Sequence, residues 1–273
     1  MSAYSSGRHE LSQNFLTNQK AIRQVISLVD ATDGAILEIG PGNGALTHPM
    51  ARSGRSITAV EIDGRLVDTL RRDVSNENVR IAHSDFLHYR VPKSIDVIVG
   101  NIPFHITTAI LRKLFRVPGW TDAVLLMQWD VARRRAGIGA STLMTAQWLP
   151  WFEFSLEGRV PASAFTPRPS VDGGILCVHR RSKPLLSWND RVPFQSMVHA
   201  VYSGRGRGIV EILVKQGLFS TREGARRWAS DRGISSKALP TSLHVGDWVD
   251  LFRTTGVSPP VKRNRKSKRN KHY

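Results

Sequence analysis

The chain has 273 residues, of which 41% are hydrophobic, and its formal net charge is +17 at pH 7. This length predicts a main domain with a small companion and enough apolar material for a core. Because no apolar run reaches the ~18 residues of a membrane span and the N-terminus is polar, we expect neither a membrane helix nor a signal peptide. The single cysteine, Cys177, lies in an apolar run and is expected to be a buried strand residue. It excludes an internal disulfide and a cysteine-based metal site, so a cytoplasmic location is expected.

Most of the positive charge lies in the last third of the chain. Residues 1–179 carry 19 Lys and Arg against 16 Asp and Glu, residues 180–260 carry 13 against 6, and residues 261–273 carry 7 against none. This distribution is typical of a surface that binds a polyanion, and a solvated basic face is the simpler alternative. We expect residues 261–273 to form a basic, disordered tail.

Strands and helices alternate along the first two thirds of the chain. A helical pattern covers residues 19–29, with Asn18 as its N-cap. Apolar runs of strand length cover residues 35–39, 56–61, 79–82, 95–100 and 121–129, and further helical patterns cover 64–73 and 106–115. The segment 151–178 is expected to supply two more strands. This order predicts an α/β fold with a largely parallel sheet covered on both faces.

A glycine-rich turn follows the first of these strands. The segment Gly40–Ala45 matches the G-x-G-x-x-G/A fingerprint of dinucleotide-binding proteins, and Glu61 lies near the offset of their ribose-binding acid. A nicotinamide dehydrogenase is therefore one alternative. Glu38 argues against it, because a carboxylate two residues before the first glycine repels a pyrophosphate and favours an ammonium group or ordered water. Asp85, after the third strand, is suited to accept a hydrogen bond from an adenine amino group, so an adenosyl cofactor fits better.

The stretch Asn101–Phe104 follows the strand predicted over residues 95–100, at the edge of an α/β sheet where ligands bind. The Asn101 side-chain oxygen and the Ile102 carbonyl are suited to accept the two N–H groups of an aromatic amine. Pro103 favours an extended conformation of the residue before it, and Phe104 offers a face on which a base can stack. The simpler alternative is a strand-to-helix turn with Phe104 in the core.

Together these motifs resemble class I S-adenosylmethionine-dependent methyltransferases and, more narrowly, the Erm family of rRNA adenine-N6 methyltransferases. The resemblance is carried by Gln13–Leu16, Glu38–Gly44, Glu61, Asp85–Leu87, Asn101–Phe104, Arg159–Pro161 and Phe165–Asp172. These motifs cover most of residues 8–180, and the segments 101–112 and 127–148 are most similar to the actinobacterial branch. The resemblance implies a Rossmann-like α/β domain with a seven-stranded, mostly parallel sheet over residues 1–181. A small all-helical domain is expected over residues 182–260.

The resemblance also implies roles for individual residues. The expected residues for binding S-adenosyl-L-methionine are Asn14, Leu16, Glu38, Gly40, Gly42, Glu61, Asp85 and Asn101. In the family Glu61 holds the ribose, Asp85 holds the adenine, and Asn101 stands between cofactor and target. The expected catalytic residues are Asn101, Ile102, Pro103 and Phe104. Position 104 is Phe where many members have Tyr, which keeps a ring for stacking.

A second aromatic wall and an RNA-binding surface are expected elsewhere. Phe165, just before a proline-rich turn, is expected beside the flipped target base, with a core Phe as the alternative. After a linker over residues 182–189, helical patterns cover 191–202, 209–216, 221–231 and 245–255. The residues expected to contact RNA are Arg133, Arg134, Arg135, Arg205, Arg207, Lys262, Arg263, Arg265 and Lys266. For the arginines, a solvated helix face or loop is the alternative. The nine histidines show no metal-ligand spacing, so no metal is expected.

We therefore expect a monomeric enzyme that methylates N6 of one adenine in the peptidyl transferase loop of 23S rRNA, free or in a partly assembled large subunit. Such a methyl group confers resistance to macrolides, lincosamides and streptogramin B. One alternative is the small-subunit rRNA adenine dimethyltransferase, whose tetrapeptide usually has Leu and Tyr where this chain has Ile102 and Phe104. Another is a non-catalytic RNA-binding relative, which would need neither an intact cofactor site nor Asn101. The choice of RNA rests on the resemblance alone.

Overall fold

The computed structural model describes residues 14–256. The chain divides into two compact units between Lys183 and Pro184, two residues beyond the predicted boundary at 181. We call these the N-terminal unit and the C-terminal unit. The predicted tail over residues 261–273, with Lys262, Arg263, Arg265 and Lys266, lies outside the described residues.

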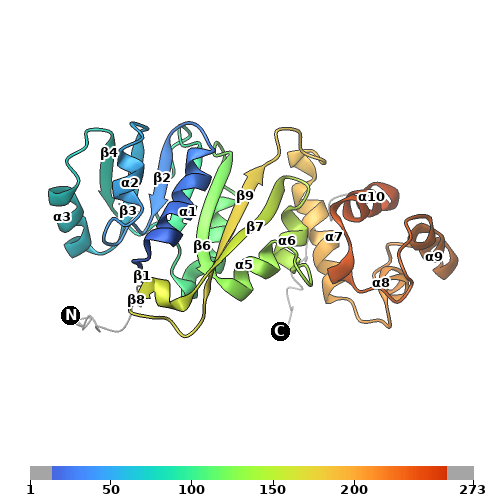
Figure 1. Cartoon of the computed structure of the whole chain (residues 1–273). Helices are drawn as coiled ribbons and strands as arrows, with labels where there is room; N and C mark the ends of the chain where they lie inside the picture. Colours follow the sequence, from blue (N-terminus) through green and yellow to red (C-terminus); the bar gives the residue numbers. More distant parts are fainter. Residues whose placement is uncertain (1–13, 257–273) are drawn as a thin grey trace, which may run out of the picture. The chain divides into compact units, whose positions relative to one another are not determined.

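Seven strands of the N-terminal unit form one sheet in the order β4-β3-β2-β5-β6-β9-β7 (Figure 1). The strands are β2 (Ile36–Ile39), β3 (Ile57–Glu61), β4 (Val79–His83), β5 (Val97–Asn101), β6 (Asp122–Gln128), β7 (Phe152–Val160) and β9 (Gly173–Arg180). The five strands from β4 to β6 pair in parallel, whereas β9 is antiparallel to both β6 and β7. The predicted α/β fold with a seven-stranded, mostly parallel sheet is confirmed.

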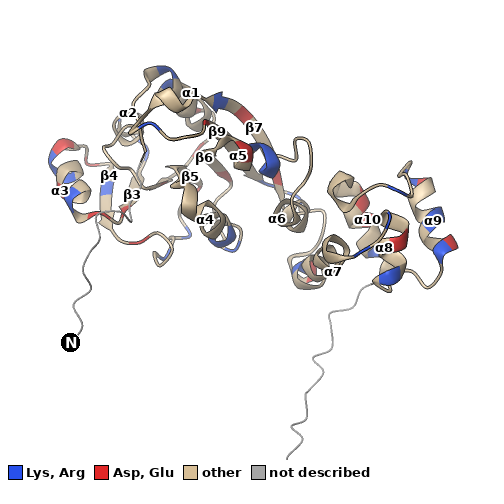
Figure 2. Ribbon diagram, turned by 90° about the horizontal axis from the view of Figure 1, so that it is seen from below, with Lys and Arg blue, Asp and Glu red and all other residues tan. Residues whose placement is uncertain are grey.

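The central strands are buried because helices cover both faces of the sheet. All four residues of β2 and the first four of β5 are buried, as expected for continuous apolar runs in a parallel sheet. In Figure 2, α1 (Gln19–Asp30) and α2 (Thr47–Ala51) lie on one side of the sheet, and α4 (Thr107–Leu114) lies on the other. Because the faces of the sheet are covered, a ligand can reach it at its edge, where the loops at the carboxyl ends of the parallel strands form a binding site in folds of this kind.

The helix starts follow the capping chemistry of the sequence. Asn18 Oδ1 accepts a hydrogen bond from the Ala21 N–H at 3.1 Å, which confirms the predicted N-cap of α1. Asp63 Oδ1 accepts from the Arg65 N–H at 2.8 Å and starts α3 (Gly64–Asp73), whose bounds are those predicted. The remaining helices of this unit are α5 (Trp129–Arg135) and α6 (Leu143–Trp148), with 3₁₀ turns at η1 (Phe104–Ile106) and η2 (Ala162–Ala164).

Two features of the N-terminal unit differ from expectation. A separate two-stranded pair joins β1 (Phe15–Leu16) to β8 (Phe165–Thr166), with Leu16 opposite Phe165. Cys177 lies in β9 but is half-buried rather than buried, because its cross-strand neighbour on the edge strand is the small, exposed Ser155.

The C-terminal unit is helical, as predicted. Its helices are α7 (Arg191–Ser203), α8 (Ile209–Lys215), α9 (Arg222–Asp231) and α10 (Val245–Thr255), with 3₁₀ turns at η3 (Trp188–Asp190) and η4 (Pro240–Ser242). Phe194, Trp228 and Trp248 are buried in its core. Within residues 14–256, no helix combines the length and the apolar character needed to cross a bilayer.

Candidate active site

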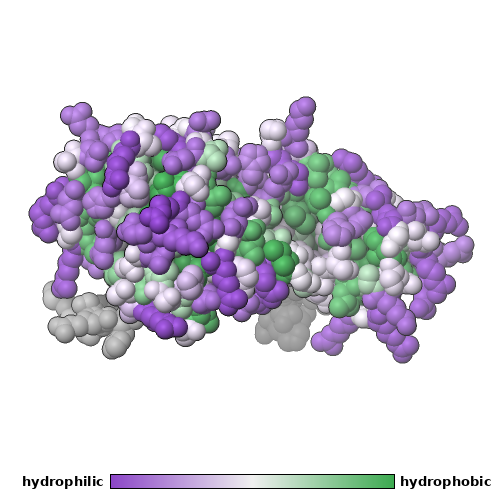
Figure 3. All heavy atoms as spheres, viewed as in Figure 1, coloured by the Kyte–Doolittle hydropathy of each residue, from purple (hydrophilic) through white to green (hydrophobic). Residues whose placement is uncertain are grey.

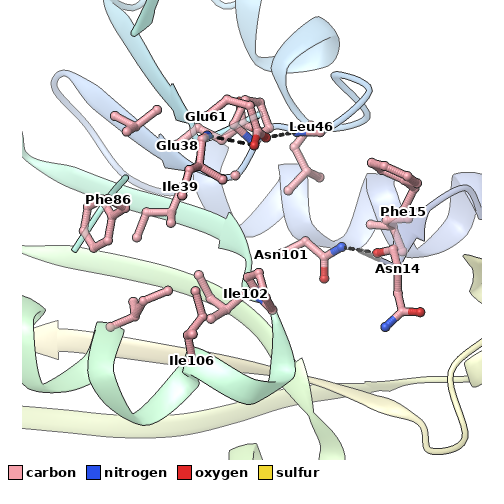
Figure 4. Close-up of a pocket in the computed structure, with 18 of the residues that line it drawn as sticks. Asn14, Phe15, Glu38, Ile39, Leu46, Glu61, Phe86, Asn101, Ile102 and Ile106 are labelled. Carbon is pink, nitrogen blue, oxygen red and sulfur yellow. Dashed lines mark hydrogen bonds between the residues drawn. The ribbon is translucent and has the colours of Figure 1, made fainter. Parts of the chain in front are cut away.

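A cavity opens at the carboxyl ends of β2, β3, β4 and β5 (Figure 4). Every residue predicted to bind the cofactor and every residue of the tetrapeptide lines it: Asn14, Leu16, Glu38, Gly40, Gly42, Glu61, Asp85, Asn101, Ile102, Pro103 and Phe104. The structure thus brings together residues that are up to 90 positions apart in the chain.

The glycine turn after β2 has a backbone that only glycine adopts without strain. Gly40 has φ +63°, and a Cβ placed there would have no atom within 4 Å, so its backbone faces open space in the cavity wall. Gly42 has φ +56°, and its Cβ would lie 2.9 Å from the ring of Phe15. A ligand can therefore approach the Gly40 backbone closely, while Gly42 makes room for the β1 segment.

Glu61 ends β3 and is held in place by backbone donors. Its side chain is only 2% exposed. Its Oε1 accepts from the N–H groups of Ile62 and Asp63 at 2.9 and 3.0 Å, and its Oε2 accepts from the Gly42 N–H at 3.1 Å. A carboxylate oxygen has two lone pairs, so Oε2 can accept one further bond from a ligand hydroxyl.

Glu38 is the most deeply buried carboxylate of the cavity, with 1% exposure. Its Oε2 accepts a hydrogen bond from the Thr47 hydroxyl at 2.7 Å. Burial raises the pKa of Glu38 to about 7; the Thr47 bond opposes this shift and the nearby Glu61 charge adds to it. The charge of Glu38 therefore changes near neutral pH. A bound ammonium group nearby would stabilise its ionised form. The role of Thr47 could not be predicted from the sequence, because nothing local links it to Glu38.

Asp85 begins the loop that closes the far end of the cavity. Its Oδ1 accepts from the Leu87 N–H at 2.8 Å, and its Oδ2 accepts from His88 Nδ1 at 2.8 Å. His88 is largely exposed. Each carboxylate oxygen keeps a lone pair for a further donor, such as an adenine amino group.

A lysine from α4 braces this loop from behind. Lys113 Nζ donates to the carbonyls of Phe86 and Tyr89, and it lies 4.7 Å from the centroid of the Phe86 ring. Burial lowers the pKa of Lys113, and the charge of Asp85 opposes that shift. Lys113 therefore ties the Asp85 loop to α4, the helix that follows Asn101–Phe104 and the short 3₁₀ turn η1. Sequence reasoning did not identify it, since a lysine on an amphipathic helix is ordinarily a solvated residue.

The Asn101 amide is oriented by the N-terminal segment of the described chain. Its Nδ2 donates to the Asn14 carbonyl at 2.7 Å, so its Oδ1 remains the free end of the amide in the cavity (Figure 4). No donor within residues 14–256 reaches that oxygen. The Ile102 N–H donates to the Leu126 carbonyl at 2.8 Å, which anchors the start of the tetrapeptide to β6. The arrangement leaves Asn101 Oδ1 as a free acceptor in the cavity wall.

Phe104 lies half-buried on the cavity wall, so its ring is not a core residue. Pro103 is extended, with φ −55° and ψ 130°. The buried Thr107 hydroxyl lies 3.3 Å from the Pro103 carbonyl and 3.2 Å from the Phe104 carbonyl, and it donates to them. This tether holds the turn in which the ring is presented.

Phe165 does not lie where the sequence analysis expected it. It is 3% exposed, belongs to the hydrophobic core and is absent from the lining of the cavity. A Cβ on Gly173 would be 3.1 Å from its ring, so the ring fills space that this glycine leaves. The expected second aromatic wall is therefore corrected: in this structure Phe165 is a core residue, because β8 pairs with β1 and turns the ring inward.

The arginines predicted to contact RNA differ in their exposure and in the contacts that their side chains make within the described residues. Arg133 pairs with Asp130 at 3.8 Å, and Arg134 is exposed. Arg135 donates to the Thr142 hydroxyl at 2.7 Å, and burial together with the charges of Arg112 and Arg134 lowers its pKa. Arg205 and Arg207 are exposed in the loop before α8.

The described residues fit an adenosyl cofactor better than a metal or a dinucleotide. Among residues 14–256, no group of three His, Cys, Asp or Glu side chains could hold a metal ion. The open backbone at Gly40, the fixed carboxylate of Glu61 and the acceptor at Asp85 suit a sulfonium-bearing side chain, a ribose and an adenine. The buried carboxylate of Glu38 behind the turn disfavours a pyrophosphate.

Comparison with known proteins supports this assignment. Residues 4–255 match the family model of ribosomal RNA adenine dimethylase. The chain is 62% identical over 219 residues to an rRNA adenine N-6-methyltransferase of Corynebacterium diphtheriae, covering 80% of this chain and 87% of that protein. It is 41% identical over 251 residues to the mycinamicin-resistance protein MyrB of Micromonospora griseorubida, covering 90% and 78%.

A solved structure agrees with these relatives. The crystal structure of the 23S rRNA methyltransferase ErmE superposes with a TM-score of 0.81 at 30% sequence identity, covering 89% of this chain and 100% of that one. The predicted class I methyltransferase fold, S-adenosylmethionine as cofactor and the enzymatic nature of the protein are thereby confirmed. The chain belongs to the ribosomal RNA adenine dimethylase family and, within it, to the Erm group of rRNA adenine-N6 methyltransferases.

Proposed function

We propose that this enzyme methylates N6 of one adenine in the peptidyl transferase loop of 23S rRNA and so confers resistance to macrolide, lincosamide and streptogramin B antibiotics. The observation that carries the chemistry is the Asn101 amide, whose orientation by the Asn14 carbonyl leaves Oδ1 free in the cavity that Phe104 also lines. The choice of 23S rRNA is supported by the similarity to ErmE, and the link to resistance by the similarity to MyrB.

The residues of the cavity perform an orientation task. S-adenosylmethionine, when bound, supplies an electrophilic methyl group on a sulfonium. Methyl transfer to a neutral amine develops positive charge on nitrogen, the sulfur leaves as a neutral thioether, and the methylated nitrogen then loses one proton to water. No strong base is therefore required. Asn101 Oδ1 and the Ile102 carbonyl would accept the two N6 hydrogens, which aligns the lone pair and stabilises the developing charge.

The target base must leave its stack to reach this site, which costs a few kcal/mol. The half-buried ring of Phe104 offers a stacking face worth about 1–3 kcal/mol, which offsets much of that cost. The substrate we propose is therefore free or partly assembled large-subunit RNA, in which the loop is still accessible to the protein. We propose that the protein acts as a monomer.

The function is tested by incubating the enzyme with labelled S-adenosylmethionine and each protein-free rRNA, with Asn101→Ala as the inactive control. Mass spectrometry of nuclease fragments then locates the modified base. We expect N6-methyladenine at one position of the peptidyl transferase loop of 23S rRNA. Methyl groups on adjacent adenines near the 3′ end of small-subunit rRNA would instead assign the enzyme to ribosome biogenesis, and no transfer to either RNA would refute the proposal.

A further inference from the structure

Helix α9 carries two arginines that no acidic side chain neutralises. Arg222 and Arg226 are exposed, and within residues 14–256 neither forms an ion pair or a side-chain hydrogen bond. They are four residues apart, so they share one face of the helix, about 5–6 Å apart at Cβ. In Figure 3, hydrophilic residues dominate the visible surface around α9.

The adjacent face of the same helix carries both acidic and basic residues. Arg227 pairs with Glu223 at 3.4 Å, and the exposed Asp231 lies one further turn along that face. Figure 2 accordingly shows both acidic and basic residues on α9. The helix therefore separates a purely cationic stripe, Arg222 and Arg226, from a stripe that carries both signs of charge.

The cationic stripe is held on a fixed support. Ala225, Trp228 and Ala229 are buried against the rest of the unit. Asp250 of α10 accepts from Trp228 Nε1 at 2.8 Å and from Arg232 Nε at 2.7 Å. This clamp neutralises Arg232 and fixes the far end of α9, while the Thr221 hydroxyl caps its start by accepting from the Gly224 N–H at 3.1 Å. Because the backbone of α9 is already held in place, it loses little conformational freedom when the stripe binds a partner.

We propose that Arg222 and Arg226 are a phosphate-binding contact through which the C-terminal unit grips the backbone of the substrate RNA. Guanidinium groups match phosphate oxygens in a bidentate manner, and two of them one helical turn apart suit a polyanion better than a single small anion. Such contacts position the RNA but do not read its bases. This inference rests on the proposed RNA substrate and adds residues that the sequence analysis did not single out.

The helix supplies a matched control for the test. Arg222→Gln/Arg226→Gln removes two free cations, whereas Glu223→Gln/Arg227→Gln removes an exposed ion pair on the same helix without changing the net charge. RNA affinity is measured by titration between 50 and 300 mM KCl, with a protein-free 23S rRNA fragment spanning the peptidyl transferase loop. The loss of two phosphate contacts should make the slope of log K against log salt shallower by about 1.4–1.8. The control variant should keep the wild-type slope.

Thermal unfolding and cofactor binding establish that each variant is folded. If the double variant proves unstable, the single variants Arg222→Gln and Arg226→Gln replace it, and each should make the slope shallower by about 0.7–0.9. An unchanged slope in the folded glutamine variants, or an equal change in the control, would overturn the inference. Failure of the wild-type enzyme to bind or methylate the RNA would instead overturn the proposed function, so the two failures are distinguishable.

Discussion

The cavity of the N-terminal unit and the α9 surface of the C-terminal unit use polar groups in opposite ways. In the cavity nearly every polar side chain is tied down: three backbone N–H groups hold Glu61, Thr47 holds Glu38, and the Asn14 carbonyl holds Asn101. On α9, Arg222 and Arg226 are exposed, and their side chains make no hydrogen bond within the described residues. The cavity is built to place atoms, whereas the helix surface supplies charge.

This contrast predicts a division of labour between chemistry and RNA holding. Methyl transfer depends on alignment, so its rate should respond to the loss of single hydrogen bonds and little to ionic strength. RNA affinity depends on counterion release, so it should respond to charge and to salt.

The largest effect should come from Asn101→Ala. The variant loses the acceptor aimed at the target amine, and we expect the single-turnover rate to fall on the order of 100-fold or more, as for other preorganised transition-state contacts. RNA affinity should stay within about twofold of wild type, because the proposed partner of the amide is the target base and the RNA backbone supplies most of the affinity. Rapid-quench kinetics and a binding titration measure the two quantities. A near-normal rate would show that alignment does not depend on this amide.

Glu38 should make the cofactor-free protein less stable as pH rises. Its folded pKa of about 7 lies above the ordinary 4.5, so the folded state binds the extra proton between these values. The stabilisation from protonated Glu38 is therefore complete below pH 4.5 and is lost as pH rises through 7, by about 3 kcal/mol at most.

Urea unfolding of wild type and Glu38→Gln at pH 5 and pH 8 tests this prediction. The difference in stability between the two proteins should shift in favour of Glu38→Gln at the higher pH. Cofactor affinity should change in the opposite sense in the wild type, since an ammonium group favours ionised Glu38. A stability difference that does not vary with pH would show that Glu38 ionises normally in the fold.

Phe104→Ala should reduce methylation of folded RNA more than Phe104→Tyr. Only the alanine variant lacks the stacking face, whose loss is worth about 1–3 kcal/mol. The ratio kcat/KM for RNA is the quantity to compare, at fixed saturating cofactor. Equal activity of the two variants on folded RNA would exclude base stacking on this ring.

The smallest effect is expected from Lys113→Met. The variant releases the carbonyls of Phe86 and Tyr89 and so loosens the loop of Asp85. We expect cofactor affinity to fall by about 5- to 10-fold. This loss is smaller than the free energy of two hydrogen bonds to a charged group, because the loop keeps its other contacts. Calorimetry measures it, and Arg116→Met, which removes an exposed cation just beyond the same helix, is the control. Equal losses in both variants would mean that charge, not bracing, is responsible.

The fold could be predicted from the sequence because its signals are local. The apolar runs that became β2, β5 and β6 have strand length and sit between helical patterns, and the bounds of α3 and α10 are those the residue pattern indicated. The motifs at the strand ends then meet in one cavity, since parallel strands place their carboxyl ends on one edge.

The parts that sequence reasoning missed depend on partners far apart in the chain. Asn14 and Asn101 are 87 residues apart, and the Asn14 contact uses a backbone carbonyl, which leaves no trace in residue type. Lys113 reaches carbonyls 24 and 27 residues away. Phe165 was misplaced because the pairing of β1 with β8, which turns its ring into the core, involves two-residue strands with no recognisable pattern.

The division of labour is tested most directly by the salt dependence of two rates of the wild-type enzyme on one 23S rRNA fragment. The ratio kcat/KM for RNA should fall linearly on a log–log plot, by about 0.7–0.9 per phosphate contact, between 50 and 300 mM KCl. The single-turnover rate at saturating RNA and cofactor should stay constant over the same range. A parallel fall of both rates would contradict the account, because the charged contacts would then act in methyl transfer itself and not only in holding the RNA.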